Sequence, residues 1–198
     1  MNLPKEIAFF DFDGTVTSKD SMLELARFYK GATGFYTGML ILLPSLIALK
    51  TRLISGQQAK EKLLSYFFGG MHTKSFDALC SKFNEQKMPR LLRENALSKI
   101  TEHKSKGHEV VLVSASAENW TMPFCKEKGM KCICSKLEVV NDCITGKLNG
   151  PNCNGPEKAN RIRAAYDLSS YQHIYAYGDS SGDAEMLQLA TDAHYRVF

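Results

Sequence analysis

A short apolar run near the start of the chain, residues 7–10, ends in two aspartates, Asp11 and Asp13, followed by Gly14. The run predicts a buried β-strand. The two acids stand two residues apart, so they leave the same face of an extended chain. Like charges this close repel one another unless a cation or a shared proton relieves them. The feature therefore indicates a strand that delivers carboxylates to a site at its carboxyl end.

Short apolar runs alternate with helical patterns along most of the chain, which is typical of an α/β fold with a mainly parallel sheet. Glycines directly after two of the helical patterns, Gly107 and Gly129, fit helix ends. Residues 136–147 predict a hairpin with its turn at Asn141 and Asp142. The predicted strands are residues 7–11, 109–114, 130–135, 173–178 and 193–197, and the predicted helices of this part are residues 89–106, 118–128, 158–166 and 183–190.

The interval between the first two strands contains no convincing strand pattern. Capping residues instead predict three helices, beginning at Ser21 and ending near residue 30, beginning at Ser55, and beginning at Thr73. We therefore expect a helical cap over the carboxyl end of the first strand, where open α/β sheets place their ligands. The predicted division is a core of residues 1–16 and 89–198 and a cap of residues 17–88.

Within the predicted cap, residues 34–49 are unusually apolar. A membrane-spanning helix needs about 20 such residues, and Pro44 interrupts this run, so we do not expect it to span a bilayer. Two alternatives remain open. The segment forms a buried pair of cap helices, or it is an interfacial segment that rests on a membrane surface.

Composition indicates a globular protein, with 198 residues of which 44% are hydrophobic and 23% charged. The formal net charge of +4 is small and scattered, which argues against a nucleic-acid-binding protein. No signal-peptide pattern follows Met1, so we expect a cytoplasmic protein with reduced cysteines. Five of its six cysteines fall within residues 125–153, but their spacing matches no zinc pattern, and we expect idle thiols. Nothing in the pattern specifies an oligomeric state.

Three further features stand at predicted strand ends or helix starts. Hydroxyl side chains beginning with Ser114 end one apolar strand, and Lys158 opens a helix after a Gly-Pro turn. Asp179 and Asp183 follow the strand at residues 173–178. A parallel sheet would bring all of these residues to the edge where Asp11 lies.

Together these runs resemble the four motifs of the haloacid dehalogenase superfamily. Residues 11–15 read Asp-x-Asp-Gly-Thr and residues 178–183 read Gly-Asp-Ser-x-x-Asp, with the strand-end serine and the lysine between them. The resemblance covers residues 7–187, and the insertion after the first motif is similar to the C1 cap of the family. The branch that contains phosphoserine phosphatase fits best. The resemblance implies a Rossmann-like parallel core, an inserted all-helical cap and phosphoryl chemistry.

The resemblance also implies a role for each motif residue. Asp11 would attack a phosphoryl group and form an aspartyl-phosphate. Asp13 would protonate the leaving alcohol and then take a proton from water. Mg²⁺ would bind Asp11, the backbone carbonyl of Asp13, and Asp179. The remaining implied roles are phosphate binding by Ser114, Ala115 and Lys158, and support of the lysine or of a metal-bound water by Asp183.

The substrate is less constrained than the reaction. Asp20 stands where phosphoserine phosphatases usually carry a glutamate at the cap entrance, and Lys60 or Lys62 replaces their substrate-binding arginine. A lysine cannot reproduce the bidentate grip of an arginine on a carboxylate, which disfavours phosphoserine. Residues 34–49 are similar to the cap of bacterial phosphatidylglycerophosphate phosphatases of the same branch. The expected substrate is a lipid phosphate such as phosphatidylglycerophosphate, met by peripheral membrane contact through residues 34–49 on the inner face of the membrane, or a small phosphoserine-like metabolite.

Other functions are compatible with parts of this pattern. A phosphomutase of the same superfamily would share both aspartates. A receiver-type signalling domain also phosphorylates an aspartate on a doubly wound sheet, but the large insertion after the first strand argues against it. A non-catalytic membrane-surface binding module would explain residues 34–49 and leave the four motifs unexplained.

Overall fold

The centre of the molecule is a sheet of five strands, and every neighbouring pair is parallel. The computed structural model describes residues 5–198. In the order β3-β2-β1-β6-β7, the strand that carries the two aspartates lies in the middle and is covered on both edges. The predicted α/β fold with a parallel sheet is confirmed. The strands are β1 (Glu6–Phe10), β2 (Glu109–Ala117), β3 (Lys131–Ser135), β6 (His173–Gly178) and β7 (Asp192–Tyr195).

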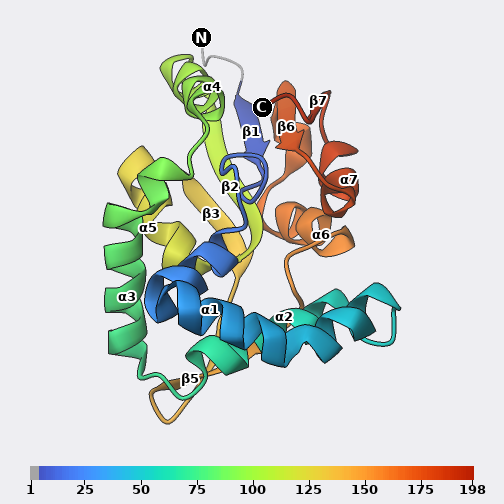
Figure 1. The fold of residues 1–198 in the computed structure, drawn as a ribbon. Helices are drawn as coiled ribbons and strands as arrows, with labels where there is room; N and C mark the ends of the chain where they lie inside the picture. The colour runs from blue at the N-terminus through green and yellow to red at the C-terminus, as the bar shows by residue number, and fades with distance from the viewer. Residues whose placement is uncertain (1–4) are drawn as a thin grey trace.

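Helices cover both faces of this sheet (Figure 1). Side chains of β1 alternate between the two faces because the side-chain period of a strand is two. Phe10 belongs to the hydrophobic cluster that includes Phe124 of α5, whereas Phe9 belongs to the cluster that includes Ile162 of α6. Burial on both faces explains why the strand reads as a continuous apolar run. The flanking elements are α4 (Glu94–Ser105), α5 (Glu118–Lys128), α6 (Pro156–Ala165) and α7 (Ala184–Leu187), with short 3₁₀ turns η1 (Met88–Arg90), η2 (Leu168–Ser170) and η3 (Ser181–Asp183).

Three helices lie between β1 and β2 along the chain, as predicted for this interval. They are α1 (Ser21–Lys50), α2 (Gly56–Phe68) and α3 (Thr73–Gln86). α1 contacts both α2 and α3, and α3 contacts α5 of the core. In Figure 1, α1 and α2 cross the end of the sheet at which β1 terminates. The inserted helices therefore lie next to the two aspartates.

The ends of the inserted helices differ in detail from the prediction. Asp20, and not Ser21, caps α1, because its carboxylate accepts a hydrogen bond from the N–H of Leu23 at 2.9 Å. The backbone at Gly31 is not helical (φ 68°, ψ 175°), so the predicted helix end near residue 30 is a kink inside a longer element. The capping box that begins at Ser55 is present as predicted.

Two extended segments join the insertion to the sheet and pair with each other. The N–H of Ser18 donates to the carbonyl of Leu91 at 2.7 Å, and the N–H of Arg93 donates to the carbonyl of Val16 at 2.9 Å. This pairing interrupts the helix predicted for residues 89–106, which forms only as η1 and α4. The two ends of the insertion are consequently fastened side by side.

A hairpin from the later part of the chain joins the inserted helices. It consists of β4 (Leu137–Val140) and β5 (Cys143–Leu148), and its turn residues Asn141 and Asp142 both have positive φ (48° and 59°), as the predicted turn requires. β5 packs on α2, and the missing side chain of Gly146 admits the backbone of Ser65, which a Cβ atom would approach to 2.3 Å. The layer over the sheet thus contains three helices and a hairpin, whereas the resemblance implied helices alone.

The apolar residues 34–49 form the second half of α1, with Pro44 inside the helix. Gly38 and Leu42 are buried against the rest of the protein, but Leu40 is 70% exposed and Ile47 is 54% exposed. The interpretation as a buried helix pair is therefore wrong. Among the described residues, α1 is the single helix with the length and apolar composition that crossing a membrane would require.

Candidate active site

The first aspartate of the motif lies at the carboxyl end of β1 next to a buried lysine. The backbone N–H of Asp11 bonds to the carbonyl of Tyr177 at 2.9 Å, which anchors it beside β6. Lys158 projects from the first turn of α6, where Pro156 begins the helix, and its ammonium contacts one carboxylate oxygen of Asp11. The same ammonium donates to Asp183 at 2.5 Å, and its side chain is only 2% exposed.

These contacts set the charge states of the group. Burial raises the pKa of Asp11 to about 7, although Lys158 opposes the rise. Burial also works against the charge of Lys158, but the two acids outweigh it and raise the pKa of the lysine above its ordinary value. Burial likewise opposes ionisation of Asp183, and Lys158 and the hydrogen bonds from Ser180 reverse this and lower its pKa. A second cation beside Asp11, in addition to Lys158, would favour the ionised form of this carboxylate.

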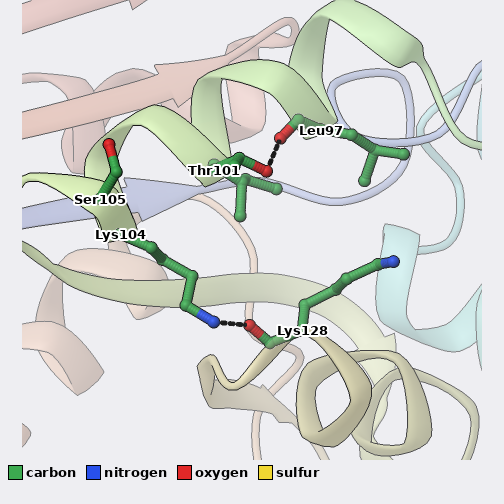
Figure 2. A pocket seen from close by; sticks show the side chains of 6 residues that line it. Leu97, Thr101, Lys104, Ser105 and Lys128 are labelled. Carbon is green, nitrogen blue, oxygen red and sulfur yellow. Dashed lines mark hydrogen bonds between the residues drawn. The ribbon is translucent and has the colours of Figure 1, made fainter.

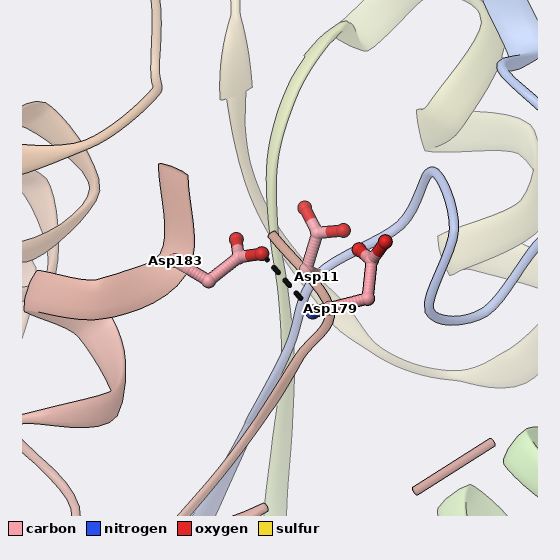
Figure 3. A group of neighbouring side chains, drawn as sticks. All are labelled: Asp11, Asp179 and Asp183. Atoms are coloured by element: carbon pink, nitrogen blue, oxygen red, sulfur yellow. Dashed lines mark hydrogen bonds between the residues drawn. The ribbon is translucent and has the colours of Figure 1, made fainter. Parts of the chain in front are cut away.

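Three carboxylates meet at this edge of the sheet (Figure 3). One oxygen from each of Asp11, Asp179 and Asp183 lies within 4.8 Å of the others. Both oxygens of Asp183 are already engaged, one by Lys158 and the other by the N–H and hydroxyl of Ser180 at 3.0 and 2.8 Å. Both oxygens of Asp183 are therefore occupied by contacts within the protein, which fits the supporting role that the resemblance implies.

Within residues 5–198, Asp11 and Asp179 each retain an oxygen without a side-chain partner. Lys158 contacts one oxygen of Asp11, and the hydroxyl of Thr15 donates to one oxygen of Asp179 at 3.2 Å. Two carboxylates with free oxygens near a single lysine fit a hard divalent cation, because Mg²⁺ prefers oxygen ligands and retains several waters. The residues present therefore suit the implied metal.

Gly14 makes room for the second of these acids. Its φ of +90° lies in the region that favours glycine, and a Cβ atom there would lie 2.4 Å from Oδ2 of Asp179. Glycine is thus required at position 14 of the first motif both by the backbone conformation and by the closeness of Asp179.

The second aspartate of the motif has different surroundings. Oδ2 of Asp13 accepts a hydrogen bond from the hydroxyl of Ser116 at 2.5 Å, and Oδ1 accepts one from the backbone N–H of Ser21 at 2.7 Å. The hydroxyl of Ser21 lies 3.2 Å from that of Ser116 and accepts a bond from the indole N–H of Trp120 at 3.0 Å. Sequence reasoning missed this network. The sequence signal that could have found Ser116 is the alternation of side chains along β2, which places it on the same strand face as Ser114.

The predicted phosphate-binding residues lie at the end of β2. Ser114 is buried, and its hydroxyl accepts a bond from the N–H of Ser116 at 3.0 Å. The carbonyl of Ala115 accepts a bond from the ammonium of Lys60 at 2.7 Å, and Lys60 also contacts Asn152 at 3.3 Å. Burial lowers the pKa of Lys60, with Asp13 acting in the opposite direction. The structure thus brings Lys60 to the strand end beside the predicted site.

Of the two residues predicted to contact substrate, Lys62 lies away from the site, whereas Asp20 lies close enough to Asp13 and Lys60 for their charges to act on its pKa, which burial and then Asp13 raise. Lys62 is exposed on another face of α2 and lines a cleft with Ser45 and Lys147. Lys62 lies away from Lys60 because side chains two positions apart on a helix point in directions that differ by about 200° around its axis. Asp20 is exposed, and its carboxylate caps α1.

Another cleft, of about 430 Å³, lies at the opposite edge of the sheet between the ends of α4 and α5 (Figure 2). The hydroxyl of Thr101 donates to the carbonyl of Leu97 at 2.9 Å, and the ammonium of Lys104 donates to the carbonyl of Lys128. These polar groups are satisfied within the protein, and the cleft contains no carboxylate. This cleft therefore lacks the cluster of carboxylates that lies at the carboxyl edge of the sheet.

The cysteine-rich part of the chain contains free thiols. Cys132 and Cys134 share one face of β3, with their sulfur atoms 3.0 Å apart, and both lie near the hydroxyl of Thr121. Among the residues that the structure describes, the three carboxylates are the only cluster with the spacing of a metal site.

Comparisons with known proteins agree with this arrangement. The family model described as haloacid dehalogenase-like hydrolase matches residues 8–188. The protein CicA of Caulobacter vibrioides is 34% identical over 96% of this chain and 85% of its own length. A probable phosphatase of Mycobacterium tuberculosis is 29% identical over 94% of this chain and 67% of its own length.

Solved structures share the fold. A phospho-aspartyl intermediate analogue of phosphoserine phosphatase superimposes with a TM-score of 0.68 at 20% identity, over 95% of this chain and 84% of that chain. The match of the family model over nearly the whole chain, together with the CicA relative, shows that this protein belongs to the haloacid dehalogenase-like hydrolase family.

Proposed function

We propose that this protein is a Mg²⁺-dependent phosphomonoester hydrolase that uses Asp11 as its nucleophile. The observation that carries the proposal is the contact of Asp11 with the buried ammonium of Lys158, beside the second acid Asp179. Asp11 has two carboxylate oxygens, so one can attack phosphorus while the other binds the metal. The family and the probable phosphatase among its relatives support phosphatase chemistry.

The reaction would proceed in two steps at Asp11. One carboxylate oxygen of Asp11 attacks the phosphorus, a bond from Asp11 to phosphorus forms, and the bond to the alcohol oxygen breaks while Asp13, protonated at the start, donates its proton to the leaving alcohol. A water then attacks the phosphorus of the aspartyl-phosphate and gives its proton to Asp13. Inorganic phosphate leaves, and both carboxyl groups return to their starting states.

The surrounding residues stabilise charge and hold the reacting groups. Lys158 offsets the negative charge that Asp11 shares with the phosphoryl group, and Asp183 fixes the position of this lysine. The hydroxyl of Ser114 at the end of β2 is the donor proposed for a phosphoryl oxygen. When bound by Asp11, Asp179 and the carbonyl of Asp13, Mg²⁺ would supply Lewis-acid neutralisation of the transferring phosphoryl group.

The substrate proposed first is a lipid phosphate such as phosphatidylglycerophosphate, ahead of a small phosphoserine-like metabolite. The cation that α2 brings to the end of β2 is Lys60, whose ammonium already donates hydrogen bonds to the carbonyl of Ala115 and the side chain of Asn152. A single engaged ammonium is a poor partner for the carboxylate of an amino acid. The exposed apolar residues of α1 favour a substrate presented at a membrane surface.

The test is hydrolysis of para-nitrophenyl phosphate by the full chain with Mg²⁺ present or removed by a chelator. We expect Asp11→Asn to reduce turnover by about 10³-fold or more, since the nucleophile is lost, while the circular dichroism spectrum stays unchanged. Undiminished turnover in this variant would overturn the mechanism. A substrate panel of phosphatidylglycerophosphate, phosphoserine and a sugar phosphate, with product analysis, then separates the substrate classes and distinguishes hydrolysis from phosphomutase activity.

A further inference from the structure

We propose that the exposed side of α1 is a docking surface for a bilayer that contains anionic phospholipid. We call this surface the α1 outer face. The inference concerns a surface away from the reacting groups and does not rest on the proposed reaction. The α1 outer face is formed by Tyr36, Leu40, Leu43 and Ile47.

The spacing of these residues makes one continuous apolar stripe. They follow one another at four, three and four positions, which places them on one side of a helix. Tyr36 is 59% exposed, Leu40 70%, Leu43 46% and Ile47 54%, and the neighbouring Ile41 is 57% exposed. Exposed apolar side chains that adjoin one another in this way are typical of a surface that a membrane or another molecule covers.

The opposite side of the same helix is firmly packed. A Cβ atom at Gly38 would lie 2.5 Å from the ring of Tyr66, and the ring of Phe35 stacks on that of Phe67 with centroids 5.9 Å apart. Leu42 is buried. α1 therefore has two apolar sides, one of which α2 occupies. A helix that keeps these contacts lies along a membrane surface, because crossing the bilayer would separate it from α2.

Positive charges flank the stripe at both ends. Arg27 and Lys30 precede it, Lys50 and Arg52 follow it, and all four are exposed. The sequence contains no acidic residue between Glu24 and Glu61. An apolar helix face flanked by cations at both of its ends along the chain is complementary to acyl chains beneath anionic headgroups.

The same charges disfavour a second copy of the chain as the occupant. If two α1 outer faces paired in either direction, cations of one copy would lie against cations of the other, since both ends of the stripe are basic. Tyr36 near one end is also the kind of amphipathic ring that favours the headgroup level. These observations select the bilayer.

The experiment is co-sedimentation of the full chain with phosphatidylcholine vesicles prepared with and without phosphatidylglycerol. We expect the protein to pellet with the anionic vesicles and to be released by high salt. The double variant Leu40→Asp/Ile47→Asp should weaken binding by about tenfold or more, because charges would enter the acyl region. The variant Lys50→Glu/Arg52→Glu should remove the preference for the anionic vesicles.

Val197→Asp is the matched control. Val197 is an exposed aliphatic residue, 50% accessible, and the C-terminus lies at the other end of the molecule from α1 (Figure 1). This variant should bind vesicles as the unmodified protein does. The far-ultraviolet circular dichroism spectrum of each variant reports whether the fold is intact, independently of any membrane and of the proposed reaction.

Three results would overturn the proposal. The first is the absence of pelleting with either kind of vesicle. The second is a stable dimer that Leu40→Asp/Ile47→Asp dissociates, with no vesicle binding, which would assign the α1 outer face to a second copy. The third is vesicle-bound protein that resists both high salt and alkaline carbonate, which would indicate a helix that crosses the bilayer.

Discussion

The two aspartates of the first motif stand two residues apart, yet different parts of the molecule hold them. Asp11 contacts Lys158, which in turn contacts Asp183, and all three belong to the sheet or to segments that flank it. Asp13 accepts hydrogen bonds from Ser116 on β2 and from the N–H of Ser21, the first residue of α1. The core therefore sets the charge of Asp11, the proposed nucleophile, whereas the position of Asp13, the proposed acid, depends also on how the insertion lies.

Apart from removal of Asp11 itself, the largest effect should follow the loss of Lys158. Lys158→Met would leave two buried carboxylates without their cation, so we expect activity to fall by about 10²–10³-fold and the free energy of unfolding by about 3 kcal/mol. Urea denaturation and steady-state kinetics measure the two effects. Lys99→Met, which removes an exposed ion pair with Glu102, is the control and should change stability by less than about 1 kcal/mol. Equal stability losses in the two variants would contradict the assignment.

A smaller loss should follow from crowding the proposed metal ligand. Gly14→Ala would place a methyl group 2.4 Å from Oδ2 of Asp179, so Asp179 must move. We expect activity to fall by about tenfold to 100-fold, with a higher Mg²⁺ concentration needed for half-maximal rate. Gly107→Ala is the matched control: its φ is also positive, at 78°, but nothing lies within 4 Å of the added atom. A Mg²⁺ dependence that stays unchanged in Gly14→Ala would argue against Asp179 as a ligand.

The surroundings of Asp13 are tested through Ser116 of β2. Ser116→Ala removes a donor to Asp13 without touching Asp11 or Lys158. We expect a loss of about tenfold on an alkyl phosphate, whose leaving group needs a proton, and a smaller loss on para-nitrophenyl phosphate, whose leaving group does not. Lys158→Met should reduce both rates alike. If Ser116→Ala lowered the two rates equally, Ser116 would not act through Asp13.

The core half of the site was predictable from the sequence because it depends on local rules. Asp11 follows a strand, Lys158 begins a helix and Asp179 follows another strand, and a parallel sheet brings such positions to one edge. The cap half depends on contacts between distant segments. Nothing local relates Trp120 to Ser21, which lie 99 positions apart and meet only when α1 docks.

Two other features of the insertion escaped prediction for related reasons. Choosing between Lys60 and Lys62 required the rotation of α2 about its axis, which its packing on α1 and β5 determines. The exposure of the α1 outer face could not be read from periodicity, because an apolar stripe has the same spacing whether it is buried or open to solvent.

The smallest effect on activity should come from a buried polar network of the core that lies outside the site. His103 is buried, with its ring nitrogens 2.9 Å from the hydroxyl of Tyr177 and 2.8 Å from the ring of His108. Burial, and then the proximity of His108, lower the pKa of His103 to about 4. Because this value lies below that of an exposed histidine, the unfolded chain binds more protons between the two values, and stability is lost as the pH falls from about 6.5 to about 4.

At pH 5 the loss attributable to His103 should be about 2 kcal/mol, and kcat at neutral pH should be unaffected by it. The measurement is urea denaturation between pH 5 and pH 7 for the unmodified protein, His103→Gln and the exposed-site control His173→Gln. We expect the slope of stability against pH to flatten only in His103→Gln. A slope of stability against pH that stays the same in all three proteins would mean that a group other than His103 takes up the protons on unfolding. A large fall in kcat for His103→Gln would mean that His103 also contributes to catalysis.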